Sequence, residues 1–124
     1  MSTERPNELL DKWTETFNAG DMEGLLALYE EDAVFFPERG NRCQGTDQIK
    51  ASLESWFALS PNLQMEGIHL VECGDLALSK SRWSLSATAA DGEPIELEGM
   101  GTEVFRKQAD GRWQFAIDDP FGPQ

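Results

Sequence analysis

Hydrophobic and polar residues alternate along the stretch from Leu76 to Asp118, in runs separated by Asp91-Gly92 and Asp110-Gly111. Alternation with a period of two residues is typical of strands that bury one face. Asp-Gly pairs favour two-residue hairpin turns, because such turns need a positive φ at both central positions. The stretch is therefore predicted to fold as a three-stranded antiparallel meander.

Two-residue turns would fix the register of both hairpins. The pairs predicted for the first hairpin are Trp83 with Met100, Ser81 with Thr102, Ser79 with Val104, and Lys80 with Glu103. Those predicted for the second are Val104 with Ile117, Thr102 with Asp119, and Glu103 with Asp118. A bulge at Gly99-Met100-Gly101 is an open alternative that would shift part of this register, since glycines within strands often mark bulges.

The register sorts the side chains of the meander onto two faces, because successive residues of a strand point in opposite directions. The face expected to pack on the core and line a cavity carries Ser79, Ser81, Trp83, Leu85, Met100, Thr102, Val104, Trp113, Phe115, Ile117 and Asp119. The face expected to meet a partner carries Leu76, Leu78, Lys80, Arg82, Leu97, Glu103, Phe105 and Asp118.

The N-terminal half has helical periodicity instead. A first helix is predicted after Pro6, with an apolar stripe at Leu9, Leu10, Trp13 and Phe17 and a glycine C-cap at Gly20. A second helix is predicted after the N-cap Asp21, with Met22, Leu25, Leu26 and Tyr29 on its apolar face. A third is predicted from Thr46 or Asp47 to Ser60-Pro61, burying Ile49, Leu53, Trp56 and Phe57.

Two further strands complete the prediction. Ala33 to Phe36 is expected to be a short strand stopped by Pro37, followed by a loop from Glu38 to Gly45. Leu63 to Glu72 is expected to be a strand whose inward face changes at Gly67. Helices first and a meander last, without βαβ alternation, predict an α+β fold with helices on one face of a mostly antiparallel sheet.

Length and charge narrow the class of protein. The 124 residues predict one domain spanning residues 1–124. The chain has 10 Lys and Arg against 23 Asp and Glu, a formal charge of −13. Such a surface repels phosphate backbones and anionic lipid, so we expect no nucleic-acid or membrane partner. No apolar run is long enough to span a bilayer, and Met1 to Asn7 lacks the apolar segment of a signal peptide, so a cytoplasmic location is expected.

The sequence offers little for a metal ion. Cys43 and Cys73 lack the spacing of a metal or redox motif and are expected to be free thiols. The chain has one His, and its acidic stretches at Glu30 to Asp32 and Glu38 to Asp47 lack the regular spacing of a calcium loop. We expect neither a metal site nor a cofactor.

The element order resembles that of the nuclear-transport-factor-2-like superfamily. Two stretches also resemble sequences of that superfamily, namely NAGDMEGLLALYEEDAVFF (Asn18 to Phe36) and GRWQFAIDDPFG (Gly111 to Gly122). Within it the chain is most similar to small SnoaL-like bacterial proteins of the YybH type. The resemblance implies a cone-shaped (cystatin-like) fold, with three N-terminal helices packed in a curved sheet around an apolar pocket. It also implies a homodimer through the outer sheet face. The superfamily includes isomerases, cyclases, dehydratases, hydrolases and non-catalytic association domains, so fold alone does not settle function.

Comparison with the ketosteroid isomerases of this superfamily tests the enzyme hypothesis. Those enzymes use a carboxylate base and two acidic hydrogen-bond donors, a Tyr and a protonated Asp. Aligned on the shared motifs, the Tyr falls on Trp13, the base on Phe36-Pro37 and the Asp on Val104. All three groups are missing here, which argues against steroid isomerisation by that mechanism.

Asp119 is the predicted catalytic candidate. Adjacent strand residues point to opposite faces, so Asp118 and Asp119 cannot form one acid–base pair. Asp119 was expected on the cavity face near Thr102, where burial would raise its pKa and make it a general base. The alternative is that Asp119 caps the turn begun by Pro120. His69 lies in a strand whose facing is ambiguous, and a structural role is the simpler interpretation.

A ligand pocket is predicted where bulky aromatic residues surround small ones. Its expected lining is Trp13, Phe17, Phe36, Trp56, Trp83, Met100, Thr102, Val104, Phe115, Ile117 and Phe121. The expected dimer face is centred on Leu78, Lys80, Arg82, Glu103, Phe105 and Asp118.

Two function hypotheses stay open. The chain is either an enzyme of the isomerase, cyclase or hydrolase type acting on a small apolar molecule, or a non-catalytic ligand-binding or dimeric interaction module.

Overall fold

The computed structural model describes residues 5–38 and 40–122. Within these residues the elements are η1 (Pro6–Glu8), α1 (Leu9–Asn18), α2 (Met22–Leu26), β1 (Tyr29–Glu38), β2 (Asn41–Gln44), α3 (Thr46–Phe57), β3 (Asn62–Cys73), β4 (Leu76–Thr88), β5 (Pro94–Lys107) and β6 (Trp113–Asp119). The described strands form one sheet in the order β2-β1-β6-β5-β4-β3. Only β1 and β6 are parallel neighbours in it. The predicted α+β class is confirmed.

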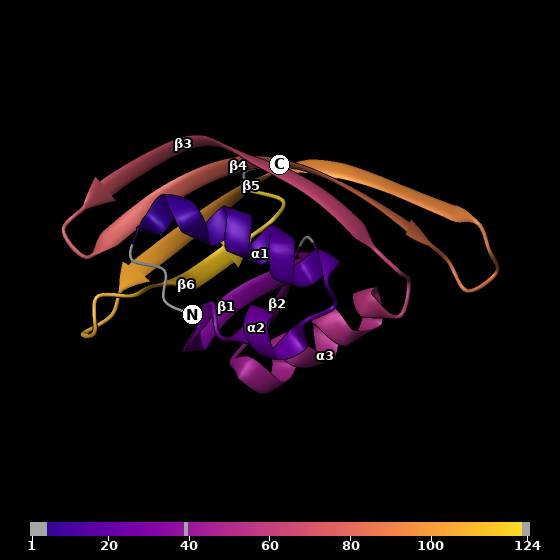
Figure 1. The fold of residues 1–124 in the computed structure, drawn as a ribbon, viewed down its shortest axis with the longest axis horizontal. Helices are drawn as coiled ribbons and strands as arrows, with labels where there is room; N and C mark the ends of the chain where they lie inside the picture. Colours follow the sequence, from indigo (N-terminus) through magenta and orange to yellow (C-terminus); the bar gives the residue numbers. More distant parts are fainter. Residues whose placement is uncertain (1–4, 39, 123–124) are drawn as a thin grey trace.

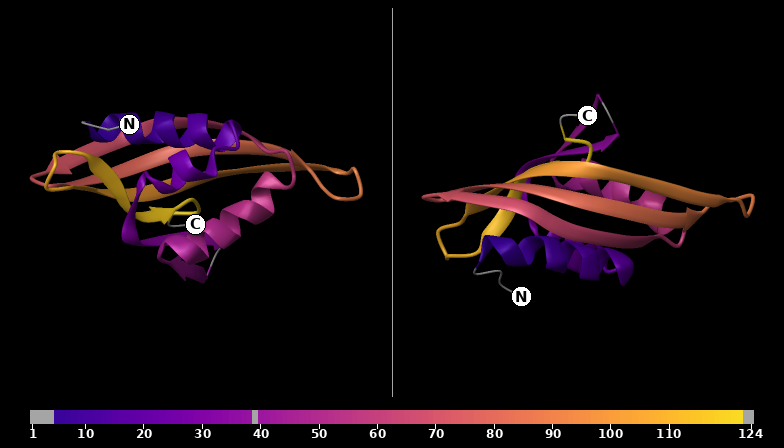
Figure 2. Two further views of the ribbon diagram at one scale, coloured as in Figure 1. Left: turned by 60° about the horizontal axis from the view of Figure 1, so that its bottom comes forward. Right: turned by 90° about the horizontal axis from the view of Figure 1, so that it is seen from above.

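The long strands and the helices form two layers. Figure 1 shows β3, β4 and β5 as an arch, with the three helices on its concave side. Figure 2 shows α1 running alongside these strands. The side chain of Asn18, at the end of α1, donates to the carbonyl of Leu63 and accepts from its N–H, at 2.8 and 2.7 Å. These two bonds fix the end of α1 to the start of β3.

The predicted second helix is too long. Asp21 is its N-cap as expected, since its carboxylate accepts from the N–H of Gly24 at 2.9 Å. The helix ends at Leu26, however, and Tyr29 is the first residue of β1. Tyr29 therefore follows the alternation of a strand, and it pairs with Phe115 of β6.

The first strand is longer than predicted, and it pairs with β2, a strand that was not predicted. β1 continues past Pro37, where its pairing with β2 is irregular between Phe35 and Glu38. A proline is tolerated at such an irregularity because no ladder hydrogen bond is needed from it. The residues from 41 to 44, predicted to be loop, form β2 at the edge of the sheet.

The third helix and the following strand lie close to their predicted positions. α3 spans the predicted region, but its N-cap is Gly45 and no side chain caps it, so neither Thr46 nor Asp47 has the predicted capping role. The register of β3 against β4 shifts between Gly67 and His69. This irregularity is the predicted change of face at Gly67.

The first hairpin has a three-residue loop instead of the predicted two. The N–H of Ala89 donates to the carbonyl of Glu93 at 2.8 Å, and Gly92 has a φ of +87°. Asp-Gly thus serves a loop whose last residue is left-handed, which is the next most common hairpin type. As a result Trp83 pairs with Gly99 rather than with Met100. The predicted register of this hairpin is wrong by one residue.

The second hairpin also has a three-residue loop in place of the predicted two, yet the three predicted pairs are confirmed. Its loop closes with a bond from the N–H of Gln108 to the carbonyl of Arg112, at 2.7 Å. Phe105 consequently pairs with Phe115, but the register then shifts, and Val104 pairs with Ile117 as predicted. The shift places an extra residue, Ala116, in β6, and this bulge compensates for the longer loop.

The one-residue error exchanges the two faces of β5, because strand side chains alternate. The structure buries Gly101, Glu103 and Phe105 on the concave face, and leaves Met100, Thr102 and Val104 on the outer face. The residues of β4 lie on their predicted faces. The corrected positions are those of Leu97, Met100, Thr102, Glu103, Val104, Phe105, Ile117, Asp118 and Asp119.

The core lies between the concave face and the helices. Phe105 and Phe115 meet edge to face at its centre, with ring centroids 4.8 Å apart, and Trp13 stacks on Phe17 at the same spacing. Leu9, Leu25, Ile49 and Leu53 are also almost fully buried. Burying one such side chain stabilises a fold by about 1.5–3 kcal/mol.

Candidate functional site

Two carboxyl groups are buried side by side on the concave face. Glu103 of β5 and Asp118 of β6 are directly paired across the strands. Their side chains therefore share one face, and they are 3% and 5% exposed. Carboxyl groups are rarely buried so deeply unless they are paired or functional. The sequence prediction assigned both residues to the outer face, so this pair is the main correction.

A chain of hydrogen bonds holds one member of the pair. The indole N–H of Trp13 donates to the hydroxyl oxygen of Tyr29 at 2.7 Å. The Tyr29 hydroxyl in turn donates to Oδ2 of Asp118 at 2.6 Å. This chain joins α1, β1 and β6, and all three side chains are buried. Asp118 is thus held in a fixed orientation.

The other member is held at one oxygen only. Oε2 of Glu103 accepts a hydrogen bond from the hydroxyl of Ser81 at 2.7 Å. Oε1 is buried and has no hydrogen-bond partner among the described residues. A buried oxygen without a partner carries a desolvation cost of about 1–3 kcal/mol, more when charged. Such an oxygen would gain from any hydrogen-bond donor that a bound molecule brought within its reach.

The carboxylate of Glu103 occupies space left by a missing side chain. A Cβ atom on Gly101 would lie 2.6 Å from Oε2 of Glu103 and 3.0 Å from the hydroxyl oxygen of Ser81. The pairing of β4 with β5 is regular through this region. The predicted bulge at Gly99-Met100-Gly101 is therefore wrong. Gly101 is needed to make room for the acid.

The environment separates the pKa values of the two acids. Burial, with a contribution from the nearby charge of Glu103, raises the pKa of Asp118 to about 8, although the hydrogen bond from Tyr29 partly opposes this rise. Burial raises the pKa of Glu103 to about 6, opposed by the hydroxyls of Ser81 and Ser79. At pH 7 Glu103 is mainly ionised and Asp118 mainly protonated. Acids separated in this way can act as base and acid in one reaction.

Tyr29 remains a hydroxyl throughout this pH range. Burial, followed by the charge of Asp118, raises its pKa well above the ordinary value of 10.0. It therefore contributes a proton-bearing donor to Asp118 and not a phenolate.

Two adjoining cavities lie beside these acids. A polar cavity of about 40 Å³ is lined by Leu10, Trp13, Met65, Ser81, Trp83, Glu103, Phe115, Asp118 and Pro120. An apolar cavity of about 80 Å³ is lined by Trp13, Phe17, Phe35, Pro37, Leu53, Trp56, Leu63, Trp83, Leu85, Leu97, Pro120 and Phe121. They share Trp13, Trp83 and Pro120 as walls. An apolar body and a polar head group of one ligand could therefore occupy both.

Trp83 is the wall that connects the cavities with the end of the chain. Its indole N–H donates to the carbonyl of Pro120 at 2.6 Å, and its ring meets Phe121 edge to face. The ring also covers Gly99, where a Cβ atom would lie 2.8 Å from it. The two glycines of the Gly-Met-Gly sequence thus make room for Trp83 and for Glu103.

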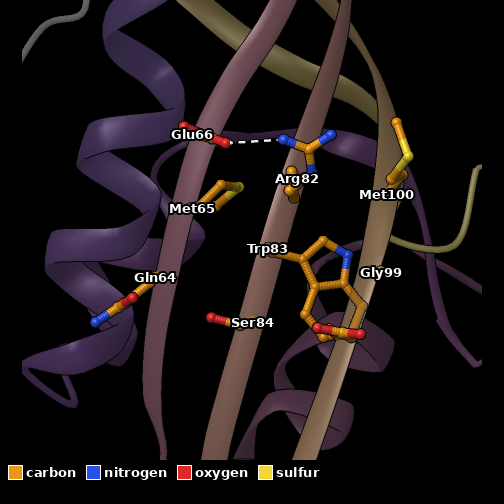
Figure 3. Close-up of a pocket in the computed structure, with 9 residues that line it drawn as sticks. Gln64, Met65, Glu66, Arg82, Trp83, Ser84, Gly99 and Met100 are labelled. Atoms are coloured by element: carbon orange, nitrogen blue, oxygen red, sulfur yellow. Dashed lines mark hydrogen bonds and ion pairs between the residues drawn. The ribbon is translucent and has the colours of Figure 1, made fainter.

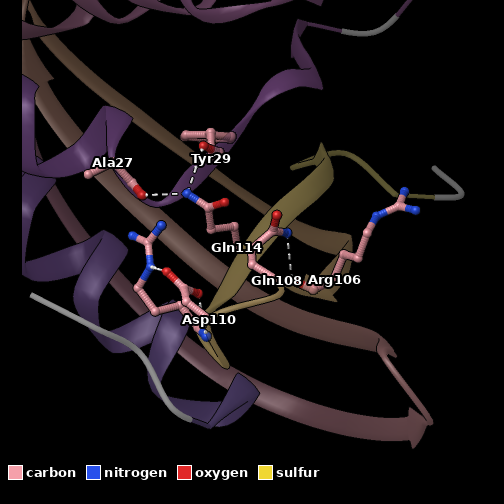
Figure 4. A network of polar contacts seen from close by, with 7 residues as sticks. Ala27, Tyr29, Arg106, Gln108, Asp110 and Gln114 are labelled. Carbon is pink, nitrogen blue, oxygen red and sulfur yellow. Dashed lines mark hydrogen bonds and ion pairs between the residues drawn. The ribbon is translucent and has the colours of Figure 1, made fainter.

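A network on the opposite side of Tyr29 fixes its backbone. The side-chain amide of Gln114 donates to the carbonyls of Ala27 and Tyr29, at 3.0 and 3.2 Å (Figure 4). The N–H of Phe115 donates to the carbonyl of Leu28 at 2.8 Å. These bonds hold the segment that connects α2 with β1 against β6. The turn that directs Tyr29 inward is therefore anchored to the strand that carries Asp118.

A larger hollow, of about 770 Å³, lies over the outer face of β3, β4 and β5 (Figure 3). It is lined by Gln64, Met65, Glu66, Arg82, Trp83, Ser84, Glu98, Gly99 and Met100. Its ion pair, between Arg82 and Glu66 at 3.1 Å, joins side chains that are 61% and 67% exposed. Such exposed pairs are weak and mobile. The buried acids, rather than this open hollow, form the candidate site.

The structure brings together about half of the predicted pocket residues. Six of them line the two inner cavities, namely Trp13, Phe17, Trp56, Trp83, Phe115 and Phe121. The other five, Phe36, Met100, Thr102, Val104 and Ile117, line neither cavity. Phe35 lines the apolar cavity in place of Phe36, since only one of two successive strand residues can point inward.

Asp119, the predicted catalytic residue, pairs with Thr102 as expected. Both lie on the outer face, because Thr102 also pairs with the exposed Lys80. Oδ1 of Asp119 accepts from the N–H of Phe121 at 3.2 Å, which is the alternative capping role at the Pro120 turn. His69 lies on the same outer face, paired with Lys80.

Sequence reasoning missed Glu103, Asp118 and Tyr29. Glu103 and Asp118 were assigned outward through the loop length, and Tyr29 was assigned to a helix. A signal for Glu103 was present in the neighbouring residues: Ser79, Ser81 and Gly101 are small, and small residues around an acid leave room for its carboxylate.

The described residues contain no group of three or more His, Cys, Asp or Glu placed to hold a metal ion. None of the described helices has the length and hydropathy needed to cross a bilayer.

Comparisons with known proteins agree with this fold. The model of the SnoaL-like domain family matches residues 10–115, and comparison with curated proteins gave no match. A conserved protein from Planctomyces limnophilus is 22% identical, with a TM-score of 0.81, and the match covers 89% of this chain and 87% of that one.

Two other solved structures are similar over most of their length. A ketosteroid isomerase-like protein from Erwinia carotovora is 23% identical over 89% of this chain and 87% of its own, with a TM-score of 0.79. A nuclear transport factor 2-like protein from Salmonella enterica is 16% identical over 95% and 88%, with a TM-score of 0.83. Its fold is shared with these structures, and the family model shows that the chain belongs to the SnoaL-like domain family.

Proposed function

We propose that this protein is an acid–base catalyst acting on a small, mainly apolar molecule held in the cone between sheet and helices. Glu103 is the base and Asp118 the acid. The observation that carries the proposal is the buried pair itself, in which one oxygen of Glu103 is unpartnered and both residues line a cavity. Strongly perturbed acids beside a cavity are characteristic of catalytic sites.

The geometry suggests a role for each group. The ionised carboxylate of Glu103 accepts a proton from the bound molecule through Oε1, while Ser81 keeps the other oxygen in place. Asp118 gives a proton to the atom on which negative charge develops. Tyr29, fixed by Trp13, keeps the acid oriented for this transfer. Proton transfer by positioned groups contributes about 10²–10⁴-fold to a rate.

Similar structures support a catalytic role without naming the reaction. Proteins of this fold have been named after ketosteroid isomerase, aromatic ring hydroxylase and dehydratase activities. The groups used by the isomerases are absent at the aligned positions here, and Val104, at one of those positions, lies on the outer face. The proposed acid–base pair would therefore be a different solution within the same cavity.

The base can be tested with nitroethane, a small neutral probe suited to cavities of this size. A base removes a proton from its C1, the electron pair moves onto the nitro group to give a nitronate, and in D2O a deuteron returns to C1, so that NMR follows the exchange. We expect the protein to accelerate this reaction, with a rate that rises as the pH passes about 6, where Glu103 loses its proton. Glu103→Gln should lower the rate by about 100-fold, because the amide cannot accept the proton.

Glu98→Gln is the matched control, since Glu98 is an exposed carboxylate on the same strand. It should leave the rate unchanged. Equal rates for folded Glu103→Gln and the unmodified protein would remove Glu103 as the base. A rate for the unmodified protein no higher than that in buffer would leave a pocket that binds without turnover.

We also propose that a second copy of the chain covers the outer face. A cross-strand row of apolar side chains crosses this face, formed by Val71, Leu78, Val104, Ile117 and Val34. Val71, Leu78 and Ile117 are 47%, 41% and 40% exposed. Around a two-fold axis such a row meets its own copy, which removes it from water. Lys80 and Arg82 lie on this face as predicted, whereas Glu103, Phe105 and Asp118 do not.

Leu78→Asp tests this surface, because it places a charge in the middle of the row. We expect the mass measured by light scattering to fall from that of a dimer to that of a monomer. Thr88→Asp, at the exposed end of the same strand, should leave the dimer intact. A monomeric unmodified protein at micromolar concentration would contradict the proposal. Phe105 is unsuitable for this test, since it is fully buried.

A further inference from the structure

The polar cavity has negative charge without a counter-charge. Its lining includes Glu103 and Asp118 and, among the described residues, neither a Lys, an Arg nor a His. At pH 7 Glu103 is mainly ionised. A buried ion without a partner of opposite charge is costly, and this cost is offset when such a partner is supplied. The described part of the protein does not supply one.

The free oxygen of Glu103 shows where that partner would lie. Oε2 is already bonded to Ser81, so only Oε1 is unpartnered. Hydrogen bonds between an ionised donor and an ionised acceptor are about twice as strong as neutral ones. An ammonium N–H directed at Oε1 would satisfy both the missing hydrogen bond and the missing charge. A carboxylate or phosphate there would add repulsion.

The remaining walls of the same cavity are aromatic and apolar. Trp13, Trp83 and Phe115 line it, together with Leu10 and Met65. Aromatic faces attract a cation with an energy of about 0.5–2 kcal/mol, which increases as water is excluded. A carboxylate surrounded by aromatic rings therefore favours an organic ammonium group over a neutral donor.

The adjoining apolar cavity limits the rest of the ligand. Its volume is about 80 Å³, and it is lined by residues including Phe17, Phe35 and Trp56. An apolar cavity of about 150 Å³ holds one benzene molecule. The body of the ligand is thus smaller than a benzene ring, about a short branched chain in size, with the head group reaching past Trp83 toward Glu103.

From these observations we infer that the site takes a small primary amine, bound as its ammonium ion with N–H directed at Oε1 of Glu103 and its apolar body in the cavity behind Trp83. This inference deepens the proposed function by naming its substrate class. It rests on that proposal only for the identity of the site, because it concerns binding and not turnover.

Three probes of nearly equal shape separate the possible head groups: isobutylamine, isobutanol and isobutyrate. Binding is measured at pH 7 by isothermal titration calorimetry. Isobutylamine should bind the unmodified protein at least about tenfold more tightly than isobutanol, and isobutyrate should not bind. Glu103→Gln should weaken isobutylamine by at least about tenfold and leave isobutanol within about threefold. Glu98→Gln should change neither.

The inference is overturned if isobutanol or isobutyrate binds as tightly as isobutylamine, or if none of the three binds at about 10 mM. It is also overturned if Glu103→Gln, shown to be folded by circular dichroism, keeps its affinity for the amine. Failure of the two proposals can be distinguished. Amine binding without turnover of nitroethane would leave an amine-binding site, and turnover without amine binding would leave a catalyst for neutral molecules.

Discussion

Asp118→Asn should remove much of the pH dependence of stability between about pH 4 and pH 8. The pKa of Asp118 is raised from 3.8 to about 8 on folding, so the folded state keeps this proton after the unfolded state has lost it. The stabilisation is complete below about pH 4 and is lost as the pH rises through about 8. Asn preserves the shape of the side chain but does not titrate.

The difference in free energy of unfolding between the two proteins isolates this effect. Each pKa unit corresponds to about 1.4 kcal/mol. Between pH 4 and pH 8 the unmodified protein should lose several kcal/mol more of its free energy of unfolding than Asp118→Asn does. The groups facing Asp118 are Glu103 from β5, Tyr29 from β1 and, through Tyr29, Trp13 from α1. Among these, Glu103 also titrates in this range, but it is present in both proteins.

Urea denaturation at intervals from pH 4 to pH 9 provides the measurement. Asp110→Asn is a suitable control, because Asp110 is exposed and its pKa is lowered by Arg112 instead of raised. Its difference from the unmodified protein should stay nearly flat above about pH 4, because a lowered pKa confines the titration of Asp110 to more acidic solutions. A flat difference for Asp118→Asn would show that the pKa of this carboxyl is ordinary.

Gly101→Ala should destabilise the protein by about 2–4 kcal/mol. The new methyl group would lie 2.6 Å from Oε2 of Glu103, so the carboxylate would have to leave Ser81. Overpacking a core costs about 1–3 kcal/mol, and loss of the hydrogen bond of a buried acid adds about 1–3 kcal/mol. Chemical denaturation at pH 7 measures the change.

Gly67→Ala is the matched control on β3, which is separated from β5 by β4. Its Cβ would lie 3.5 Å from a methyl group of Leu10, which is ordinary contact. In a Glu103→Ala background the cost of Gly101→Ala should largely disappear, because the atom in the way is gone. A full cost in that background would mean that the backbone, and not the carboxylate, makes Gly101 necessary.

Much of the fold could be predicted from the sequence, because periodicity reports burial directly. The stripes of α1 and α3 and the alternation of β4 all predicted the correct faces. β2 could not be predicted, since a four-residue edge strand buries almost nothing and leaves no apolar pattern. The end of α2 was missed because Tyr29 suits either a helix or a strand, and tertiary pairing with Phe115 decides between them.

The candidate site was harder to predict. The face on which the acids lie follows from the strand register, and the register was predicted from the number of residues in each loop. The predicted two-residue loops gave the correct pair of Glu103 with Asp118 but placed it on the wrong face. Asp-Gly is compatible with loops of two and three residues. The sequence therefore predicted that these two acids are neighbours, and the structure was needed to show that they are buried.

The bulge at Ala116 and the three-residue loops show where the hairpins can vary in length. One residue more or fewer among residues 90–92 can be absorbed by the loop, because loops of two to five residues all connect paired strands. One residue inserted within β5 before Gly101 would instead turn the rest of the strand over, moving Phe105 and Glu103 to the solvent and Val104 into the core. Related chains that keep the buried acids should therefore vary in this loop more than in the length of β5, unless a second bulge has restored the alternation.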